Sequence, residues 1–173
     1  MPEAPHPRPP VLVGIVGWKN SGKTTLVERL IPPLLRSGFK VMTVKHTHHE
    51  LRPADGATDG ERHTRAGALK AIVIAPDAWE ISGVRQTSPP PSLGEITPHV
   101  TGADIVLVEG FKSAHIPKIE LRRSASPTRE PLAPGDTCVA AIAADHATDA
   151  GELPLFDLDD AEAIAGFIAA LAR

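Results

Sequence analysis

Residues 17–25, GWKNSGKTT, combine two glycines, two lysines and hydroxyl side chains directly after the apolar run VLVGIV. The spacing fits G-x-x-x-x-G-K-[ST], a pattern in which backbone N–H groups at a helix N-terminus surround phosphate oxygens and the lysine reaches the β- and γ-phosphates. We therefore predict a phosphate-binding loop, against the alternative of a glycine-containing turn with an exposed lysine. The residues expected to contact a nucleotide are Gly17, Asn20, Ser21, Gly22, Lys23, Thr24 and Thr25.

Two oxygen-bearing side chains are candidates for a Mg²⁺ site. The hydroxyl of Thr24 stands where a loop of this kind binds the metal. Glu109 ends the apolar run DIVLVE, and a carboxylate at the tip of a strand beside a phosphate loop holds Mg²⁺ or its water shell. Glu109 is for the same reason a candidate catalytic residue. The alternative is an acidic residue that is simply solvated at the end of a strand.

The segment KHTHH, residues 45–49, places three imidazoles within four positions. Such a cluster could bind zinc, but the sequence has no second group of cysteines or histidines at the spacing of structural zinc sites. We therefore expect Lys45, His46 and His49, together with Lys112, to contact phosphate or a partner protein, and a transition-metal site is the alternative.

A long polar stretch follows at residues 50–68, ELRPADGATDGERHTRAGA. Polar loops of this length are often functional. We predict a switch in which Asp59 faces Mg²⁺ or the attacking water while an arginine, Arg62 or Arg65, faces the γ-phosphate. The alternative is a solvated, disordered loop.

The elements that must position these side chains are visible as five apolar runs, at residues 11–17, 39–45, 69–75, 104–110 and 138–144. The runs are mostly continuous rather than alternating, as in strands that are covered on both faces. Helical patterns occupy 23–37 and the stretch that begins near Asp159 or Asp160. The sequence predicts an α/β chain with a mainly parallel sheet, the three-layer P-loop NTPase fold. Ligands of such sheets bind beyond the carboxyl ends of the strands.

One further segment, IPKIELRR at residues 116–123, alternates between apolar and charged side chains. Alternation is typical of a strand with one solvated face, so we expect an extra edge strand or a hairpin arm. An exposed strand edge favours pairing with another chain, and a two-fold dimer is the commonest result. The segment therefore predicts a homodimer.

Length and composition limit the remaining possibilities. The 173 residues predict one domain over 11–173, after a Pro-rich segment 1–10, MPEAPHPRPP, that we expect to be disordered. A net charge of −3 argues against a nucleic-acid surface, and no apolar stretch reaches the 18 residues of a membrane span. The single cysteine, Cys138, fits a reduced, cytoplasmic setting.

Four motifs follow one another along the chain: GWKNSGKTTL, VKHTHH, VEGFK and PKIEL, with Asp59 and Arg62 between the second and the third. In this order they resemble the MobB family, the molybdopterin-guanine dinucleotide biosynthesis protein B family. The resemblance runs from about residue 11 to the C-terminus. It implies a GTP-binding protein with weak GTPase activity, usually dimeric, that acts with the guanylyltransferase attaching GMP to molybdopterin. It implies GTP and Mg²⁺ as ligands, with molybdopterin as a further candidate.

The residue that reads the base is less evident from the sequence. Asp145 ends the run AIAAD at the rim where the ligand is expected, and a carboxylate can accept both N1–H and the exocyclic amine of guanine. The usual Asn-Lys-x-Asp signature is missing, because Ile142 and Ala143 stand at its first two positions. We expect Asp145 to contact guanine, against the alternative of an aspartate that only starts a loop.

Three functions remain open from the sequence. The first is a slow GTPase of molybdenum cofactor biosynthesis. The second is a small-molecule kinase, in which Arg62 and Arg65 belong to a lid over the phosphate acceptor. The third is an adaptor that binds nucleotide with no significant turnover and docks on an enzyme. A kinase consumes nucleotide only with a second substrate, whereas the sequence does not separate the first function from the third.

Overall fold

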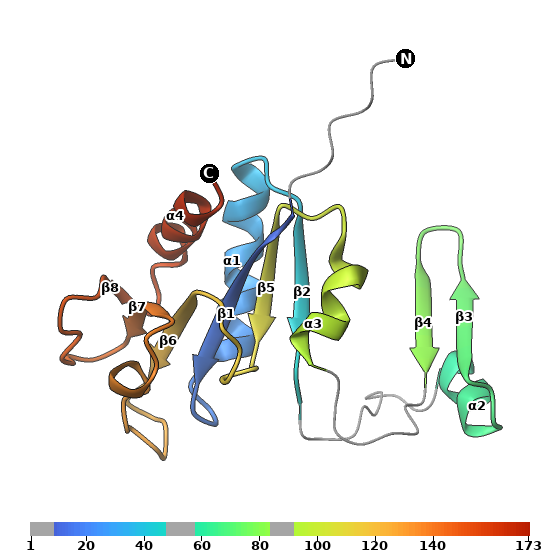
Figure 1. The fold of residues 1–173 in the computed structure, drawn as a ribbon, viewed down its shortest axis with the longest axis horizontal. Coiled ribbons are helices and arrows are strands. Elements are labelled where there is room, and N and C mark those ends of the chain that lie inside the picture. The colour runs from blue at the N-terminus through green and yellow to red at the C-terminus, as the bar shows by residue number, and fades with distance from the viewer. Residues whose placement is uncertain (1–8, 48–57, 84–91) are drawn as a thin grey trace. The chain divides into compact units, whose positions relative to one another are not determined.

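The computed structural model describes residues 9–47, 58–83 and 92–173. The chain forms two compact units, one of Met1–His46 with Leu93–Arg173 and the other of Thr47–Ser92 (Figure 1). Whether the units act together as the one domain predicted over 11–173 stays a prediction. Most of the Pro-rich segment 1–10 lies outside the described residues.

The first unit contains a six-stranded parallel sheet, with the strand order β2-β5-β1-β6-β7-β8. The strands are β1 (Val11–Gly17), β2 (Val41–Lys45), β5 (Ile105–Glu109), β6 (Lys118–Arg122), β7 (Val139–Ala144) and β8 (Leu155–Asp157). Four of the five predicted apolar runs form strands of this sheet. The predicted α/β class with a mainly parallel sheet is confirmed.

Helices cover the two faces of the sheet (Figure 1). On one face, α1 (Lys23–Arg36) and α4 (Ala161–Leu171) share a core with inward-facing residues of β1, β5, β6 and β7. On the other face, α3 (Leu93–Ile96) and the 3₁₀ turn η1 (Thr97–Val100) pack over Val106 and Val108. Leu30, Leu34 and Ile168 are fully buried in the first core, and burial of one such side chain stabilises the fold by about 1.5–3 kcal/mol.

The helix ends follow local chemistry that the sequence displays. Asp160 accepts a hydrogen bond from the backbone N–H of Ala163, 2.9 Å away, and so caps α4 as predicted. Gly38, with φ +86°, donates its N–H to Leu35 O and closes α1. Helix α1 begins directly after Gly22, so the predicted phosphate loop leads into a helix N-terminus.

Strand β6 corrects the prediction of an edge strand or hairpin arm at 116–123, because it lies between β1 and β7 inside the sheet. Its charged side chains are buried rather than solvated. Lys118 is paired with Asp136, and Glu120 with Arg122. The Lys118 side chain passes over β1 at Gly14, where a Cβ would lie 2.9 Å from Lys118 Cγ. The alternation of apolar and charged residues in β6 therefore reflects two buried faces, one apolar and one ion-paired. Because β6 is paired on both sides, it offers no free strand edge for a homodimer.

The second unit contains α2 (Asp59–Arg65) and an antiparallel pair of strands, β3 (Lys70–Ile74) and β4 (Trp79–Gly83). The apolar run 69–75 is thus half of a hairpin, and its prediction as a strand of the parallel sheet is wrong. Pro76 and Asp77 form the turn, which the hydrogen bond from Ala75 N to Ala78 O closes. Four large apolar side chains of the hairpin are exposed: Ile72, Ile74, Trp79 and Ile81.

Candidate functional site

The loop between β1 and α1 has the backbone geometry that its glycines predict. A Cβ on Gly17 would lie 2.5 Å from the hydroxyl oxygen of Ser21 and 2.9 Å from Leu121 O, so only glycine fits this tight turn. Gly22 has φ +87° and Asn20 has φ +64°, both in the left-handed region. The chain thereby curls back over the end of β1 and presents the first turn of α1 at the carboxyl edge of the sheet.

Lys23 lies across this loop. Its Nζ donates hydrogen bonds to the backbone oxygens of Gly17, at 3.2 Å, and Trp18, at 2.8 Å. Burial lowers the pKa of Lys23 below its usual value, Lys112 and Lys45 lower it further, and Glu109 opposes the shift. The ammonium group therefore lies in a partly desolvated region crowded with positive charge, where an added anion would be favoured.

Thr24 and Glu109 meet at the end of β5. The Thr24 hydroxyl donates a hydrogen bond of 2.8 Å to Glu109 Oε1, and Glu109 is buried. The Nζ of Lys45 lies 3.0 Å from the Thr24 hydroxyl and 3.3 Å from the same Glu109 oxygen. A hydroxyl and a carboxylate at this separation are the hard oxygen donors that Mg²⁺ prefers, and the nearby ammonium shows that the position accommodates a cation.

Two more predicted contact residues lie at the same edge. Lys112 Nζ lies 3.8 Å from the centre of the Trp18 ring, and burial lowers the pKa of Lys112. The His46 ring lies 4.6 Å from the Phe111 ring, and its backbone N–H donates to Glu109 O. The structure thus brings Lys45, His46 and Lys112 to the carboxyl end of β5.

Asp145 follows β7 and is firmly held. Its carboxylate accepts hydrogen bonds from Ser124 N at 2.6 Å, from the Ser124 hydroxyl at 2.9 Å and from His146 Nδ1 at 2.8 Å. Burial raises the pKa of Asp145, but these hydrogen bonds outweigh it and lower the value to about 2. Asp145 lines a cavity of about 100 Å³ together with Gly22 and Thr25 of the loop. The structure therefore places Asp145 beside the predicted phosphate loop.

Two arginines in the same cavity were not predicted as site residues. Arg123 places Nη1 3.5 Å from the position of a Cβ on Gly22, so its guanidinium lies over the loop. Arg29, from α1, also lines the cavity and is paired with Asp159 at 2.6 Å. Arg123 directly follows β6, and it could have been found in the sequence only by recognising β6 as a central strand whose end opens beside the loop.

The predicted switch residues belong to the second unit. Asp59 and Arg62 lie on α2, where Arg62 Nη1 is 3.4 Å from Asp59 Oδ1 and both side chains are exposed. Their roles toward a nucleotide stay predictions. His49 lies outside the described residues, as does His48, and the described part of the chain contains no group of three or more His, Cys, Asp or Glu side chains arranged to hold a metal ion.

Comparisons with known proteins agree on one family. Residues 12–145 match the family model of MobB, molybdopterin guanine dinucleotide synthesis protein B. The chain is 36% identical to the molybdopterin-guanine dinucleotide biosynthesis adapter protein of Haemophilus influenzae, over 91% of this chain and 86% of that protein. It is 31% identical to the protein of the same name from Escherichia coli, over 91% and 90%.

Solved structures support the same relationship. The crystal structure of Bacillus subtilis MobB superposes with a TM-score of 0.71 at 27% identity, covering 94% of this chain and 98% of that one. A MobB homologue from Bacillus stearothermophilus gives a TM-score of 0.69 at 26% identity, with 94% and 97% covered. The family model and the relatives thus agree with the motifs and the parallel sheet described above. The chain belongs to the MobB family.

Proposed function

We propose that this protein is an adapter of molybdopterin-guanine dinucleotide biosynthesis, which binds GTP and Mg²⁺ at residues 17–25 and assists the guanylyltransferase that attaches GMP to molybdopterin. The adapter role is supported by membership of the MobB family and by relatives that carry this name. The observation that carries the nucleotide proposal is the convergence of Lys23, Thr24 and Glu109 at the start of α1.

The phosphates of GTP fit the loop for electrostatic reasons. The first N–H groups of α1 have no partner within the helix, and the helix dipole adds positive potential at the same end. Lys23 already bridges two carbonyl groups of the loop with its ammonium group. A phosphate offers that ammonium stronger, charged acceptors than the two carbonyls do.

The Mg²⁺ proposal rests on the Thr24 hydroxyl and the Glu109 carboxylate. Mg²⁺ bound there would neutralise phosphate charge. Lys45 contacts both groups and would keep a second positive charge close to the terminal phosphate. Lys112, which is close enough to lower the pKa of Lys23, adds a third, so the site suits a ligand with several negative charges.

Guanine is proposed to lie in the cavity that Asp145 lines. Ser124 and His146 hold the carboxylate in one orientation and keep it ionised, so it can accept hydrogen bonds from the base. The cavity continues directly from Gly22 and Thr25, which is where a nucleoside attached to loop-bound phosphates would extend. Arg123 lies over the same opening and fits a role against the base or the α-phosphate.

Hydrolysis by the isolated protein is proposed to be slow. An arginine that stabilises the γ-phosphate in the transition state contributes roughly 10³–10⁵ in rate. Arg62 and Arg65 are each held by an acidic residue of their own helix, Asp59 at 3.4 Å and Glu61 at 3.7 Å. We expect phosphate release well below the enzyme median of about 10 s⁻¹. Acceleration only on addition of a second small substrate would favour the kinase alternative.

The assembly and the setting are also proposals. We propose a homodimer, with the exposed apolar side chains of the β3–β4 hairpin as its surface in place of β6. Molybdopterin is retained as a further candidate ligand, and the cytoplasm as the compartment. Within the described residues, the structure has no helix of the length and hydropathy needed to cross a bilayer.

Titration calorimetry with GTP and Mg²⁺ tests the nucleotide proposal. Lys23→Ala should abolish binding while leaving the thermal unfolding midpoint unchanged. Lys19→Ala is the matched control, because Lys19 is an exposed lysine of the same loop. Equal GTP affinity of Lys23→Ala and the wild type would reject the phosphate-loop assignment.

The partner is tested separately with purified guanylyltransferase. The immobilised wild-type protein should retain the enzyme, and addition of GTP and Mg²⁺ should change the amount retained. Lys23→Ala should respond to neither nucleotide nor metal. Failure of the wild type to retain the enzyme under any nucleotide condition would remove the adapter role while leaving GTP binding intact.

A further inference from the structure

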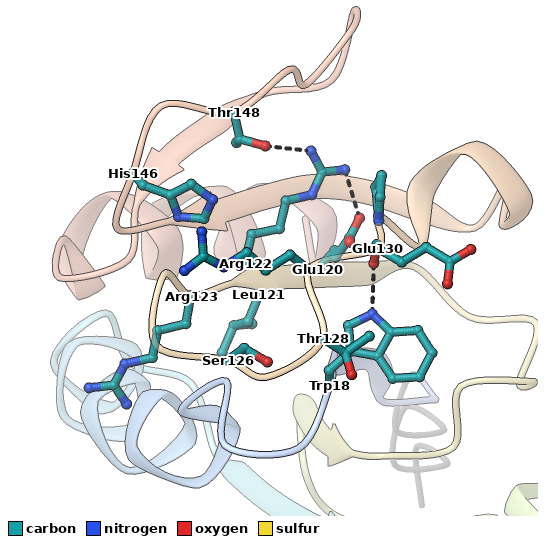
Figure 2. A pocket seen from close by; sticks show the side chains of 12 residues that line it. Trp18, Glu120, Leu121, Arg122, Arg123, Ser126, Thr128, Glu130, His146 and Thr148 are labelled. Atoms are coloured by element: carbon teal, nitrogen blue, oxygen red, sulfur yellow. Dashed lines mark hydrogen bonds and ion pairs between the residues drawn. The ribbon is translucent and has the colours of Figure 1, made fainter.

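A second pocket borders the loop on the side of Trp18, between the segment after β6 and the segment after β7 (Figure 2). Its cavity volume is about 40 Å³. Three of its lining residues are arginines, and we call it the arginine pocket. The lining residues used in the argument are Trp18, Arg122, Arg123, Thr128, Arg129 and His146.

Arg122 forms the floor of the arginine pocket, and its side chain is only 8% exposed. Its Nη1 donates to the Thr148 hydroxyl at 3.0 Å and to Asp149 O, and its Nη2 donates to Glu120 Oε2 at 3.0 Å, as Figure 2 shows for the side-chain contacts. Its Nε is buried and has no hydrogen-bond partner among the described residues. Buried N–H groups are almost always paired in native proteins, so this one indicates an acceptor that the described residues do not supply.

The negative charge nearest to Arg122 is already engaged. Glu120 Oε1 accepts the N–H of Leu132 at 2.7 Å, and Oε2 accepts the N–H of Ala133 at 3.0 Å besides the bond from Arg122. Glu120 is thus directed at the backbone and the floor of the pocket. It neutralises Arg122 without occupying the Nε–H, which remains available to a further acceptor.

The other two arginines of the pocket lack acidic partners. Within the described residues, no carboxylate pairs with Arg123 or Arg129, and Arg129 donates only to the backbone oxygen of Ser124. His146 is held through Nδ1 by Asp145, which leaves its other ring nitrogen free of that bond. Three guanidinium groups and an imidazole therefore surround a small cavity in which only Glu120 and Glu130 carry negative charge.

We propose that the arginine pocket binds the phosphate group of a second ligand, separately from any phosphate held by the loop. Guanidinium groups match the oxygens of a phosphate in geometry and charge, and the buried Nε–H of Arg122 supplies a fixed donor at the base. Trp18 belongs to both sites, and the Ser126 hydroxyl binds Lys19 O at 3.2 Å. A ligand in the pocket would consequently lie next to the loop, and Arg123 lines both this pocket and the Asp145 cavity.

Calorimetry with inorganic phosphate tests the pocket in the full-length protein. Lys23→Ala removes the main phosphate ligand of the loop, so phosphate binding that persists in this variant, expected in the millimolar range, reports the pocket. Adding Arg129→Gln to Lys23→Ala should weaken the remaining binding at least tenfold. Arg129 is exposed, which makes the substitution compatible with folding. Arg36→Gln in the same background is the matched control for charge, because Arg36 pairs with Glu162 on the surface.

Two further measurements separate the alternatives. Wild-type protein that has been saturated with GTP should still bind one phosphate. If the GTP proposal is wrong, only this measurement is lost, because the titrations of Lys23→Ala use no GTP. Phenyl phosphate should bind with an affinity similar to that of inorganic phosphate if the pocket accepts a phosphate ester, whereas its exclusion would assign the pocket to free phosphate. Absence of phosphate binding in Lys23→Ala, or equal binding with and without Arg129→Gln, would overturn the proposal and leave a water-filled structural cavity.

Discussion

The Thr24 hydroxyl donates a hydrogen bond of 2.8 Å to the Glu109 carboxylate, across 85 positions of sequence. The contact joins the first turn of α1 to the end of β5, and Lys45 from β2 contacts both side chains. A helix and two neighbouring strands thus meet at one pair of oxygen atoms. Three of the predictions below depend on such contacts in the first unit.

Replacing Glu109 by Gln should weaken Mg²⁺ binding in the presence of GTP. The amide keeps the shape and the hydrogen bond to Thr24 but removes the negative charge, and loss of a group that orients or holds a metal typically costs 10–100-fold in affinity. We expect the Mg²⁺ concentration at half-saturation to rise about tenfold or more. Asp104→Asn, at the opposite end of β5, is the control and should change nothing. Equal Mg²⁺ dependence of Glu109→Gln and wild type would contradict the metal site.

Removing the carboxylate of Glu120 should destabilise the fold strongly. Glu120→Ala leaves the buried Arg122 and two backbone N–H groups without their acceptor, and breaking a buried ion pair from one side costs about 3–5 kcal/mol. Urea unfolding should show this loss. Glu162→Ala breaks an exposed pair with Arg36 and should cost less than about 1 kcal/mol. Similar stabilities of the two variants would show that the polar face of β6 contributes little.

Acid should destabilise the protein partly through Asp145. The pKa of Asp145 is lowered to about 2 in the folded chain, below its ordinary value, so its ionised form stabilises the fold above about pH 4, and this contribution is lost as the pH falls towards 2. Thermal melting across this range should show a shallower decline for Asp145→Asn than for the wild type. Asp136, whose pKa is also lowered, contributes in the same direction and remains in both proteins. Parallel melting curves would exclude a stabilising role for the Asp145 charge.

The hairpin should mediate self-association. Ile74 is 81% exposed and Trp79 is 69% exposed on a two-stranded sheet, and a patch of this kind in a soluble protein marks a contact surface. Sedimentation of the wild type should give a mass above that of one 18.3 kDa chain, and Ile74→Glu should restore the single-chain mass. Glu80→Gln, on an exposed residue of β4, is the control. A wild type that sediments as one chain at micromolar concentration would disprove the dimer.

Local patterns predicted the parts of the site that depend on neighbouring residues. The loop, the first turn of α1 and the cap at Asp160 follow from spacing and residue type within a few positions. Continuous apolar runs correctly gave four parallel strands, because strands covered on both faces need few polar residues. The position of Glu109 at the end of one such strand also followed from the run itself.

Features that depend on distant partners could not be predicted in the same way. Lys118 and Glu120 alternate with apolar residues as in an exposed strand, and only Asp136, Arg122 and the backbone at 132–133 make their burial possible. Once β6 was placed at an edge, Arg123 could not be assigned to the loop. The apolar run 69–75 alone does not distinguish a parallel strand from a hairpin arm, and the turn residues Pro76 and Asp77 that follow it decide for the hairpin.

Trp18 gives the protein a built-in optical reporter. Its indole donates a 2.6 Å hydrogen bond to Glu130 O and carries the Lys112 ammonium 3.8 Å from its ring centre, so both neighbours influence its emission. The sequence contains only one other tryptophan, Trp79, which is exposed on the hairpin and accessible to a soluble quencher. In a Trp79→Phe variant, fluorescence would come from Trp18 alone. Ligands of the loop and of the arginine pocket could then be followed in real time without any label.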